Sequence, residues 1–370
     1  MPDFYIGLMS GTSLDGVDGV LADFSPSSPL VIAHASAPFA DALRAELLAL
    51  NSAGPNELHR AALAGNALVR VYAQVVDALL ADSSIQPYEV RAIGAHGQTV
   101  RHRPQQFDGT GYTLQLNQPA LLAERSGIDV VADFRSRDVA AGGQGAPLAP
   151  FFHQAFFSRP GQTVGVLNVG GISNLTLLRP GGAVLGFDCG PGNALMDGWC
   201  SAHTGRPYDD QGAWAASGAV LPALLDALLA EPYFALAPPK STGRDLFHMA
   251  WLQACLQVRG ASAAAADVQA TLAELSALAC ANEVLRHEPD LRHLIVCGGG
   301  ALNTHLMQRL QALLPQAQVR SSADHGLPPL QVEATAFAWL ARKTVLREKL
   351  ELESTTGARG ARVLGAVYPA

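Results

Sequence analysis

Short apolar runs separated by polar, glycine-bearing turns organise this chain. Residues 4–9 form one apolar run, residues 10–18 form a turn rich in Gly, Ser, Thr and Asp, and residues 19–24 form a second apolar run. This pattern predicts a β-hairpin whose connection is longer than a two-residue turn. Small residues let a ligand approach the backbone, and the hydroxyls and amides of the turn offer a polyphosphate several donors. An ordinary polar loop has the same composition, so the rest of the chain decides between the two interpretations.

The first half continues as a mixture of buried strands and helices. Leu68, Tyr72, Val75 and Leu79 recur at helical spacing in its longest helix. The predicted elements are a strand at 29–35, a helix at 56–81, a strand at 91–95, a polar loop at 105–113, a helix at 119–127 and a strand at 128–134. A glycine-rich segment at 142–147 follows as a hinge or site loop.

The second half repeats this order of elements. It predicts strands at 163–169, 175–178 and 183–188, helical segments to about 287, a strand at 291–297, a helix at 304–314, a strand near 318–320 and a helix at 332–350. Alternating elements are common in α/β proteins, but each half opens with a glycine-containing hairpin. A Rossmann fingerprint would lie at a strand-to-helix turn instead. We interpret the chain as two similar lobes with a cleft between them.

Domain boundaries follow from this repeat. Residues 1–135 are expected to form an N-terminal lobe, and residues 136–345 a C-terminal lobe. Residues 346–370 form a tail whose lobe the pattern leaves open.

Composition narrows the class of protein. The 370 residues are 49% hydrophobic and 15% charged, which is typical of a globular chain. A net charge of −7 argues against nucleic acid as a partner. Five scattered cysteines without a C-x-x-C pair are expected to be reduced thiols. The N-terminus lacks the pattern of a signal peptide, and no apolar run is long enough for a bilayer. We expect a cytoplasmic protein with small-molecule partners and no membrane partner, and a homodimer is left open.

Three glycine-bearing turns at strand ends are the candidate nucleotide site. Two hairpins could hold opposite ends of a triphosphate, and the third turn, which leads into a helix, suits the nucleoside. In this order the turns resemble those of the actin-like ATPase superfamily, which includes sugar kinases, heat-shock ATPases and actin. The resemblance implies ATP binding by Ser10, Gly11, Thr12, Ser13, Leu14, Asp15, Gly16, Val17, Asp18, Gly170, Gly171, Asn174, Gly298, Gly299, Gly300 and Asn303.

One position departs from the superfamily pattern. Gly7 stands where an acidic residue is usual in the first hairpin strand, so the metal ligands are left unassigned. Asp15 and Asp18 are the nearby substitutes.

Longer motifs narrow the resemblance to the anhydro-N-acetylmuramic acid kinases. They occur at 9–16, 96–99, 132–135, 142–147, 186–193, 239–244 and 296–300, and the resemblance runs from residue 4 to residue 369. It implies a kinase that uses ATP and Mg²⁺ to open the 1,6-anhydro bond of the sugar with water and to phosphorylate O6. The product would be N-acetylmuramic acid 6-phosphate, in peptidoglycan recycling. Alternatives are a kinase for another sugar or small acid on this fold, and a non-catalytic nucleotide-gated binding module.

Asp188 is the candidate general base that activates the water. It ends a strand beside Gly190 and Gly192, where a carboxylate can face a cleft. The alternative is that Asp188 caps the following helix. Lys240, between Pro239 and a Ser-Thr-Gly run, is either a solvated lysine or a nucleotide or hinge contact.

Three further positions are candidate sugar ligands. Glu333 could simply complement a helix dipole, but the family resemblance implies a sugar contact. Arg137, with Arg135 as the second choice, could bind a lactyl carboxylate in a bidentate manner. His96 could be a strand-end histidine with its hydrogen bonds satisfied, or a sugar ligand, which Gly97 and Gln98 favour.

Overall fold

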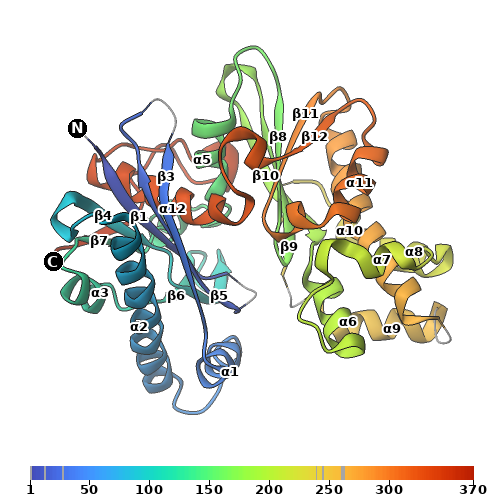
Figure 1. Ribbon diagram of the computed structural model, residues 1–370, viewed down its shortest axis with the longest axis horizontal. Coiled ribbons are helices and arrows are strands. Elements are labelled where there is room, and N and C mark those ends of the chain that lie inside the picture. The colour runs from blue at the N-terminus through green and yellow to red at the C-terminus, as the bar shows by residue number, and fades with distance from the viewer. Residues whose placement is uncertain (1, 12–13, 27–28, 239, 244–245, 260–262) are drawn as a thin grey trace. The chain divides into compact units, whose positions relative to one another are not determined.

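A computed structural model describes residues 2–11, 14–26, 29–238, 240–243, 246–259 and 263–370 (Figure 1). The chain divides into two compact units, the first made of Met1–Phe156 and Gln331–Ala370 and the second of Phe157–Leu330. This division differs from the expected boundaries at 135 and 345. Residues 136–156 and the last helix belong with the first unit, and so does the tail, because its strand pairs there.

The first unit is built on a six-stranded mixed sheet. Its strands, in spatial order, are β13 (Ala366–Tyr368), β7 (Val130–Ala132), β4 (Val90–Ala95), β1 (Phe4–Met9), β2 (Gly16–Asp23) and β3 (Leu30–Pro38). Strands β1, β2 and β3 are antiparallel neighbours, whereas β4 and β7 run parallel to β1. The helices are α1 (Asp41–Ala49), α2 (Glu57–Ser83), α3 (Pro119–Ser126), α4 (Ser136–Ala140), α5 (Ala149–Phe157), α12 (Val332–Val345) and α13 (Glu353–Thr356).

Two long helices cover opposite faces of this sheet. A Cβ added at Gly7 would lie 1.8 Å from the backbone oxygen of Ala334 in α12. The next residue, Leu8, points to the other face, because side chains alternate along a strand. There it joins the core that contains Leu68 and Val76 of α2. The sheet is therefore buried between α12 and α2.

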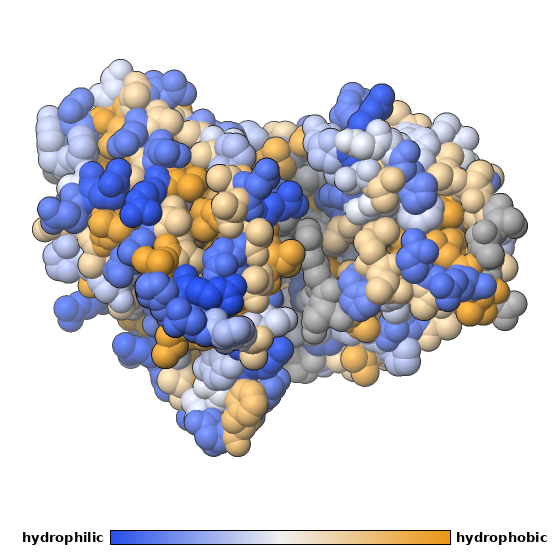
Figure 2. Space-filling model, turned by 90° about the horizontal axis from the view of Figure 1, so that it is seen from below, coloured by the Kyte–Doolittle hydropathy of each residue, from blue (hydrophilic) through white to orange (hydrophobic). Residues whose placement is uncertain are grey.

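Helix α2 is also the one described helix that is long and apolar enough to cross a membrane. Half of the relevant window is buried inside the protein, and the helix contacts β2 and β3. The face shown in Figure 2 mixes hydrophilic and hydrophobic side chains over its surface. We therefore describe α2 as a core helix of the first unit.

The second unit repeats the strand order. Its five strands, in spatial order, are β10 (Val184–Pro191), β9 (Ile172–Leu178), β8 (Val164–Val169), β11 (His293–Cys297) and β12 (Gln318–Ser321). Strands β8, β9 and β10 are antiparallel neighbours, and β11 and β12 run parallel to β8. The order β3-β2-β1-β4-β7 of the first unit follows the same pattern. The repeated topology is the arrangement of the actin-like ATPase fold and confirms the predicted duplication.

One buried helix joins the two cores of the second unit. Helix α10 (Ala265–His287) contributes Leu272 and Leu275 to a core among helices, and Cys280 and Val284 to the core on the sheet. The other helices are α6 (Ala194–Thr204), α7 (Ala213–Ser217), α8 (Pro222–Leu229), α9 (Met249–Arg259) and α11 (Thr304–Leu313). The unit also contains the 3-10 turns η3 (Asp210–Gly212), η4 (Pro232–Ala235) and η5 (Gly299–Leu302). Helix α10 thus provides a rigid base along the whole unit.

Some element predictions were wrong in detail. The expected loop at 105–113 lies largely between β5 (Gln98–Pro104) and β6 (Gly111–Leu116), which pair as a separate two-stranded sheet. The last long helix ends at Val345 instead of residue 350. The terminal strand β13 was not predicted, because a three-residue strand has too little pattern and forms only by pairing with β7.

Candidate functional site

The tip of the β1–β2 hairpin is tied to the segment that follows β4. The Ser10 hydroxyl donates to the backbone oxygen of Gly97 at 3.2 Å, and the Gly97 N–H donates to the Tyr72 hydroxyl at 3.0 Å. Because the Ser10 proton is used, the Tyr72 hydroxyl must donate to Ser10 Oγ, 3.1 Å away. This closed ring of hydrogen bonds is buried, and burial raises the pKa of Tyr72 to about 12. The ring holds the turn in place.

Other residues of the hairpin turn divide into buried and accessible groups. Leu14 and Val17 are core side chains, and a Cβ at Gly16 would lie 2.3 Å from the backbone oxygen of Ala37. The carboxylates of Asp15 and Asp18 are accessible and lie 3.7 Å from Arg44 and His34, respectively. Thr12 and Ser13 lie outside the described residues.

His96 and Arg135 form the centre of the first-unit site. Two guanidinium nitrogens of Arg135, Nε and Nη2, lie 3.1 and 2.9 Å from His96 Nε2, and Nη1 donates to the Gly145 backbone oxygen at 2.7 Å. A guanidinium can only donate, so His96 Nε2 accepts and the ring is neutral with its proton on Nδ1. Burial, and then the charge of Arg135, holds the pKa of His96 well below its usual value. Arg137, the preferred candidate, is exposed on α4, so Arg135 is the arginine that the structure places on His96.

A buried carboxylate shapes the glycine-rich loop at 142–147. Asp138 is fully buried and accepts hydrogen bonds from the Gly145 N–H at 2.6 Å and from the Thr356 hydroxyl. A Cβ at Gly143 would lie 2.2 Å from Asp138 Oδ2, so only glycine fits. Burial raises the pKa of Asp138. Sequence analysis missed this residue, because the groups that donate hydrogen bonds to it come together only once the loop and the tail are folded.

Helix α12 explains the glycine at position 7 and places Glu333. Gly7 and Gly94 of adjacent strands face the backbone of α12, and a Cβ at Gly94 would lie 2.1 Å from the Phe337 backbone oxygen. An acidic side chain at position 7 would therefore meet the helix. Glu333 is half-buried in the first turn of α12, on the same helix face as Phe337, whose ring centroid is 4.6 Å from that of His96. Helix α12 therefore packs directly on β1 and β4, and its Phe337 lies against His96, which follows β4.

The turn of the second hairpin is fixed by the segment that follows β10. Backbone N–H groups of Gly192 and Asn193 donate to the oxygens of Gly171 and Gly170 at 2.9 and 2.8 Å. The Asn193 side chain donates to the Val169 backbone oxygen at 3.0 Å. Asn174 is the register partner of Asp188 in the β9–β10 ladder, so the second hairpin turn adjoins the candidate base.

Asp188 is held on three sides. Its Oδ2 accepts a hydrogen bond from the Thr242 N–H at 3.0 Å, its own N–H donates to the Lys240 backbone oxygen at 3.2 Å, and its backbone oxygen accepts from the Tyr233 hydroxyl at 2.8 Å. The residue is half-buried inside β10, and Asn193 occupies the N-cap position of α6. Asp188 is therefore not the cap of that helix, and its carboxylate is oriented by a backbone amide.

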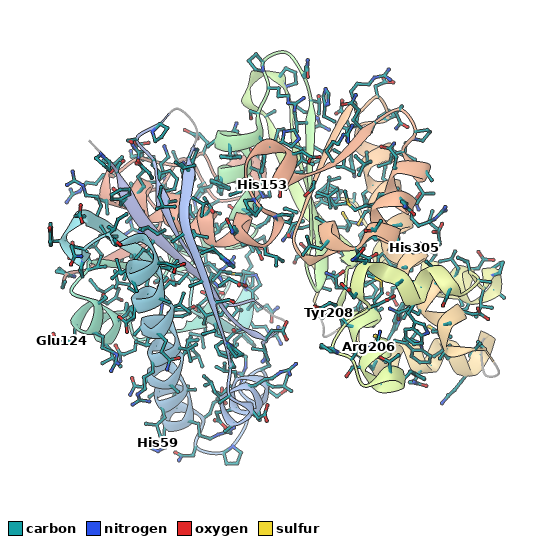
Figure 3. The ribbon with its side chains drawn as sticks, in the orientation of Figure 1. His59, Glu124, His153, Arg206, Tyr208 and His305 are labelled. Atoms are coloured by element: carbon teal, nitrogen blue, oxygen red, sulfur yellow. The ribbon has the colours of Figure 1, made fainter. Side chains whose placement is uncertain are left out.

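The third turn follows β11 and begins α11. Gly298 has φ 75°, and a Cβ there would lie 2.5 Å from Asn168 Oδ1. Asn303 Oδ1 accepts from the Leu306 N–H at 3.0 Å and so caps α11. A Cβ at Gly212 of η3 would lie 2.7 Å from Cβ of His305, which Figure 3 labels in the first turn of α11. Gly298, Gly299 and Gly300 thus lie between the end of β8 and the start of α11.

Metal ligands are not defined by these side chains alone. Among the described residues, no group of three or more His, Cys, Asp or Glu side chains gathers as a metal site. Mg²⁺ in nucleotide sites is held mostly by phosphates and water with one or two carboxylates. The accessible carboxylates of Asp15 and Asp18 fit that kind of site.

Comparison with known proteins decides the family. A family model described as anhydro-N-acetylmuramic acid kinase matches residues 3–370. The chain belongs to the anhydro-N-acetylmuramic acid kinase family. A protein of that name from Variovorax paradoxus (strain S110) is 68% identical, covering 100% of this chain and 99% of its own length. Another of that name, from Albidiferax ferrireducens, is 64% identical, covering 100% of both chains. A solved structure, the activator of the 2-hydroxyisocaproyl-CoA dehydratase from Clostridium difficile with bound ADPNP, is 11% identical with a TM-score of 0.49, covering 93% of this chain and 97% of its own.

Within this anhydro-N-acetylmuramic acid kinase family member, each unit gathers its own predicted residues. The first unit brings together Ser10, Gly11 and His96 with Arg135, and leaves Arg137 exposed on α4. Glu333 lies one helical turn before Phe337, the residue whose ring packs on His96. The second unit brings Gly170, Gly171 and Asn174 beside Asp188. Lys240, for which a solvated lysine and a nucleotide or hinge contact were the alternatives, is not solvated: it is buried with its ammonium 3.0 Å from Glu283.

Proposed function

We propose that this protein uses ATP and water to convert 1,6-anhydro-N-acetylmuramic acid to N-acetylmuramic acid 6-phosphate, in the cytoplasmic recycling of peptidoglycan. The family supports the kinase and the sugar, since its curated relatives carry the name anhydro-N-acetylmuramic acid kinase. The observation that carries the proposal is the carboxylate of Asp188, which the Thr242 N–H orients within β10, where Asp188 pairs with Asn174 of the second hairpin just before a register shift. A carboxylate held in this way can act as a general base.

In the proposed reaction, Asp188 takes a proton from a water molecule, which attacks C1 of the sugar. The bond between C1 and O6 breaks, and O6 attacks the γ-phosphorus of ATP, so ADP leaves. One water proton stays on the new C1 hydroxyl, and the other leaves Asp188 for solvent. The protein's task is mostly positioning and charge stabilisation, as in other phosphoryl transfers. When bound, Mg²⁺ supplies positive charge that neutralises the phosphates.

The remaining residues have binding roles in this proposal. Backbone amides of the two hairpin turns contribute to phosphate binding, and Gly298–Gly300 with Asn303 contribute to binding of the nucleoside. His96 is neutral and therefore interacts with the sugar by hydrogen bonding and not by charge. Glu333 contacts a sugar hydroxyl. Arg135 and Arg137 both remain candidates for the lactyl carboxylate, and Arg135 gains support from its contact with His96.

The test is the fate of the water oxygen. Turnover in ¹⁸O-water should label the anomeric oxygen of the 6-phosphate product in short incubations, read by mass spectrometry. Unlabelled product placed in the same water measures exchange through ring opening. N-acetylmuramic acid, which has a free anomeric hydroxyl and no 1,6-anhydro bond, is the control substrate, since any phosphorylation of it needs no water. Label at the control rate only, or label in inorganic phosphate, would contradict the proposal in favour of a conventional kinase or a plain ATPase.

A further inference from the structure

A buried ion pair lies behind Asp188 in the second unit. Lys240 Nζ is 3.0 Å from Glu283 Oε1, and the two side chains are 2% and 3% exposed. Glu283 also meets Arg286 at 2.9 Å and His287 at 3.3 Å. Burying charges costs free energy that their attraction only partly returns, so such a pair calls for an explanation beyond stability.

The same residues hold the backbone around Asp188. The Lys240 ammonium lies 4.9 Å from the centroid of the Tyr233 ring, and the Tyr233 hydroxyl donates to the Asp188 backbone oxygen. The Lys240 backbone oxygen accepts from the Asp188 N–H, and two residues later the Thr242 N–H donates to the Asp188 carboxylate. Lys240 therefore connects the side chain of Glu283 to both the main chain and the carboxylate of Asp188.

Glu283 provides a fixed anchor for this connection. It is on α10, whose side chains belong to both cores of the unit. Groups that position a reacting atom work best when they are supported by packed helices. The Lys240 ammonium, held on Glu283 with its side chain 2% exposed, is directed into the protein and not toward a ligand.

We propose that Lys240 and Glu283 are positioning residues for Asp188: their ion pair holds residues 240–242 against β10 and so sets the direction of the carboxylate toward the attacking water. The proposal rests on the proposed function in that Asp188 is taken as the base. It assigns Lys240 to the orientation of a catalytic group and not to the nucleotide.

The test compares Glu283→Gln and Lys240→Met with a matched control, Glu274→Gln. Glu274 is also a buried carboxylate on α10, but it pairs with Arg309 of α11 at 2.6 Å. A misplacement of a catalytic group by about 1 Å can cost about a hundredfold in rate. We expect kcat to fall about 10- to 100-fold in Glu283→Gln and Lys240→Met, with KM for ATP and sugar within about threefold. Glu274→Gln should keep kcat within about twofold.

The double variant gives an independent readout. Glu283→Gln with Lys240→Met removes both charges, so its loss in kcat should be no larger than that of the worse single variant. Hydrogen exchange of the peptide that contains Thr242 should be faster in each single variant and unchanged in Glu274→Gln.

If a charge variant does not fold, Tyr233→Phe removes only the hydroxyl that donates to the Asp188 backbone oxygen. This variant should lower kcat several-fold at unchanged melting temperature.

The outcomes separate the two proposals. Unchanged kcat in the folded Glu283→Gln and Lys240→Met variants, while Asp188→Asn is inactive, would overturn the positioning role and leave the proposed function intact. A tenfold rise of KM for ATP at unchanged kcat in Lys240→Met would make Lys240 a nucleotide contact and also overturn it. If Asp188→Asn is active, the proposed function fails, and faster exchange at Thr242 still shows whether the pair fixes this segment.

Discussion

The two sheets share a strand order but differ in what their third strands do. In the first unit β3 is an edge strand with exposed Leu30 and Ile32, and it carries none of the predicted site residues. In the second unit β10 occupies the same place in the order and bears Asp188, with a register shift between Asp188 and Gly190. The topology therefore sets where strand ends lie, and the segments packed against those ends decide which of them carry chemistry.

The first strands differ as well. Gly7 of β1 faces the backbone of α12, whereas Gly165 of β8 faces the tips of two leucine side chains, at 2.9 Å from the position of a Cβ. A backbone cannot move aside as a side-chain tip can. Both first strands are thus closely packed at these glycines, but the obstacle is backbone at Gly7 and the movable ends of leucine side chains at Gly165.

The largest expected effect concerns the third-strand difference. Asp188→Asn removes the basic oxygen with little change of shape and should lower kcat by about a thousandfold, or about 4 kcal/mol of barrier. Steady-state kinetics measures the loss in kcat, and calorimetry measures nucleotide binding, which should be unchanged. In the first unit β3 carries no candidate site residue, so the comparison is Asp18→Asn on the neighbouring strand β2, which should act mainly on KM for ATP. Near-normal turnover in Asp188→Asn would remove the distinction between the two third strands.

The next effect concerns the packing of the first strands. Gly7→Ala should lower the free energy of unfolding by about 3 kcal/mol or more, because the added carbon meets the backbone of α12. Gly165→Ala should cost less than about 1 kcal/mol, since leucine tips can move and alanine is favoured over glycine in strands. Denaturant unfolding of both variants measures the difference. Equal losses would show that the two sheets tolerate a side chain equally.

A third prediction concerns acid. Burial lowers the pKa of His153 to about 3 and holds that of His96 well below its usual value, and both are in the first unit. In the unfolded chain each ring binds a proton below about pH 6.5, whereas in the folded protein it stays neutral. The contribution of each histidine to the free energy of unfolding is therefore complete above pH 6.5 and is lost as the pH falls toward the folded pKa. The loss between pH 6.5 and 5 is up to about 2 kcal/mol per histidine.

The second unit should respond less to the same change. Its histidines with lowered pKa, including His287 and His293, are only partly buried. Limited proteolysis at pH 7.5 and 5, with mapping of the peptides, assigns the first cut to a unit. His153→Gln should reduce the acid sensitivity more than His287→Gln does. A first cut in the second unit at pH 5 would reverse this comparison.

The smallest effect concerns the fourth strands. β4 leads into the segment tied by Tyr72, whereas β11 leads into a helix capped by Asn303. Asn303→Ala should cost about 1 kcal/mol of stability by loss of the cap. Asn303→Asp keeps a capping oxygen and should restore the melting temperature, while its added charge raises KM for ATP. Unchanged KM in both variants would restrict Asn303 to its structural role.

Local pattern was enough to predict most strands and the positions of the three turns. Short apolar runs and glycine-bearing turns mark β1, β2, β8 and β9 because a hairpin is built from neighbouring residues. The short helix α3 and the long helix α2 were predicted within a few residues. The hairpin of β5 and β6 was not predicted, because its two strands contain many polar residues and no continuous apolar run.

Tertiary structure decided how these elements are grouped and which charges are buried. The last helix belongs with the first unit because Gly7 and Gly94 leave space for its backbone, and this fit between distant residues has no local signature. Between a proline and a polar run, Lys240 could be a solvated lysine or a nucleotide or hinge contact, and only the fold places it on Glu283 of α10. By itself the sequence determined the strand ends and the chemistry available there, since both depend on neighbouring residues. The orientation of Asp188 and the partners of His96 and Lys240 depend on residues far along the chain, which only folding brings within hydrogen-bond distance.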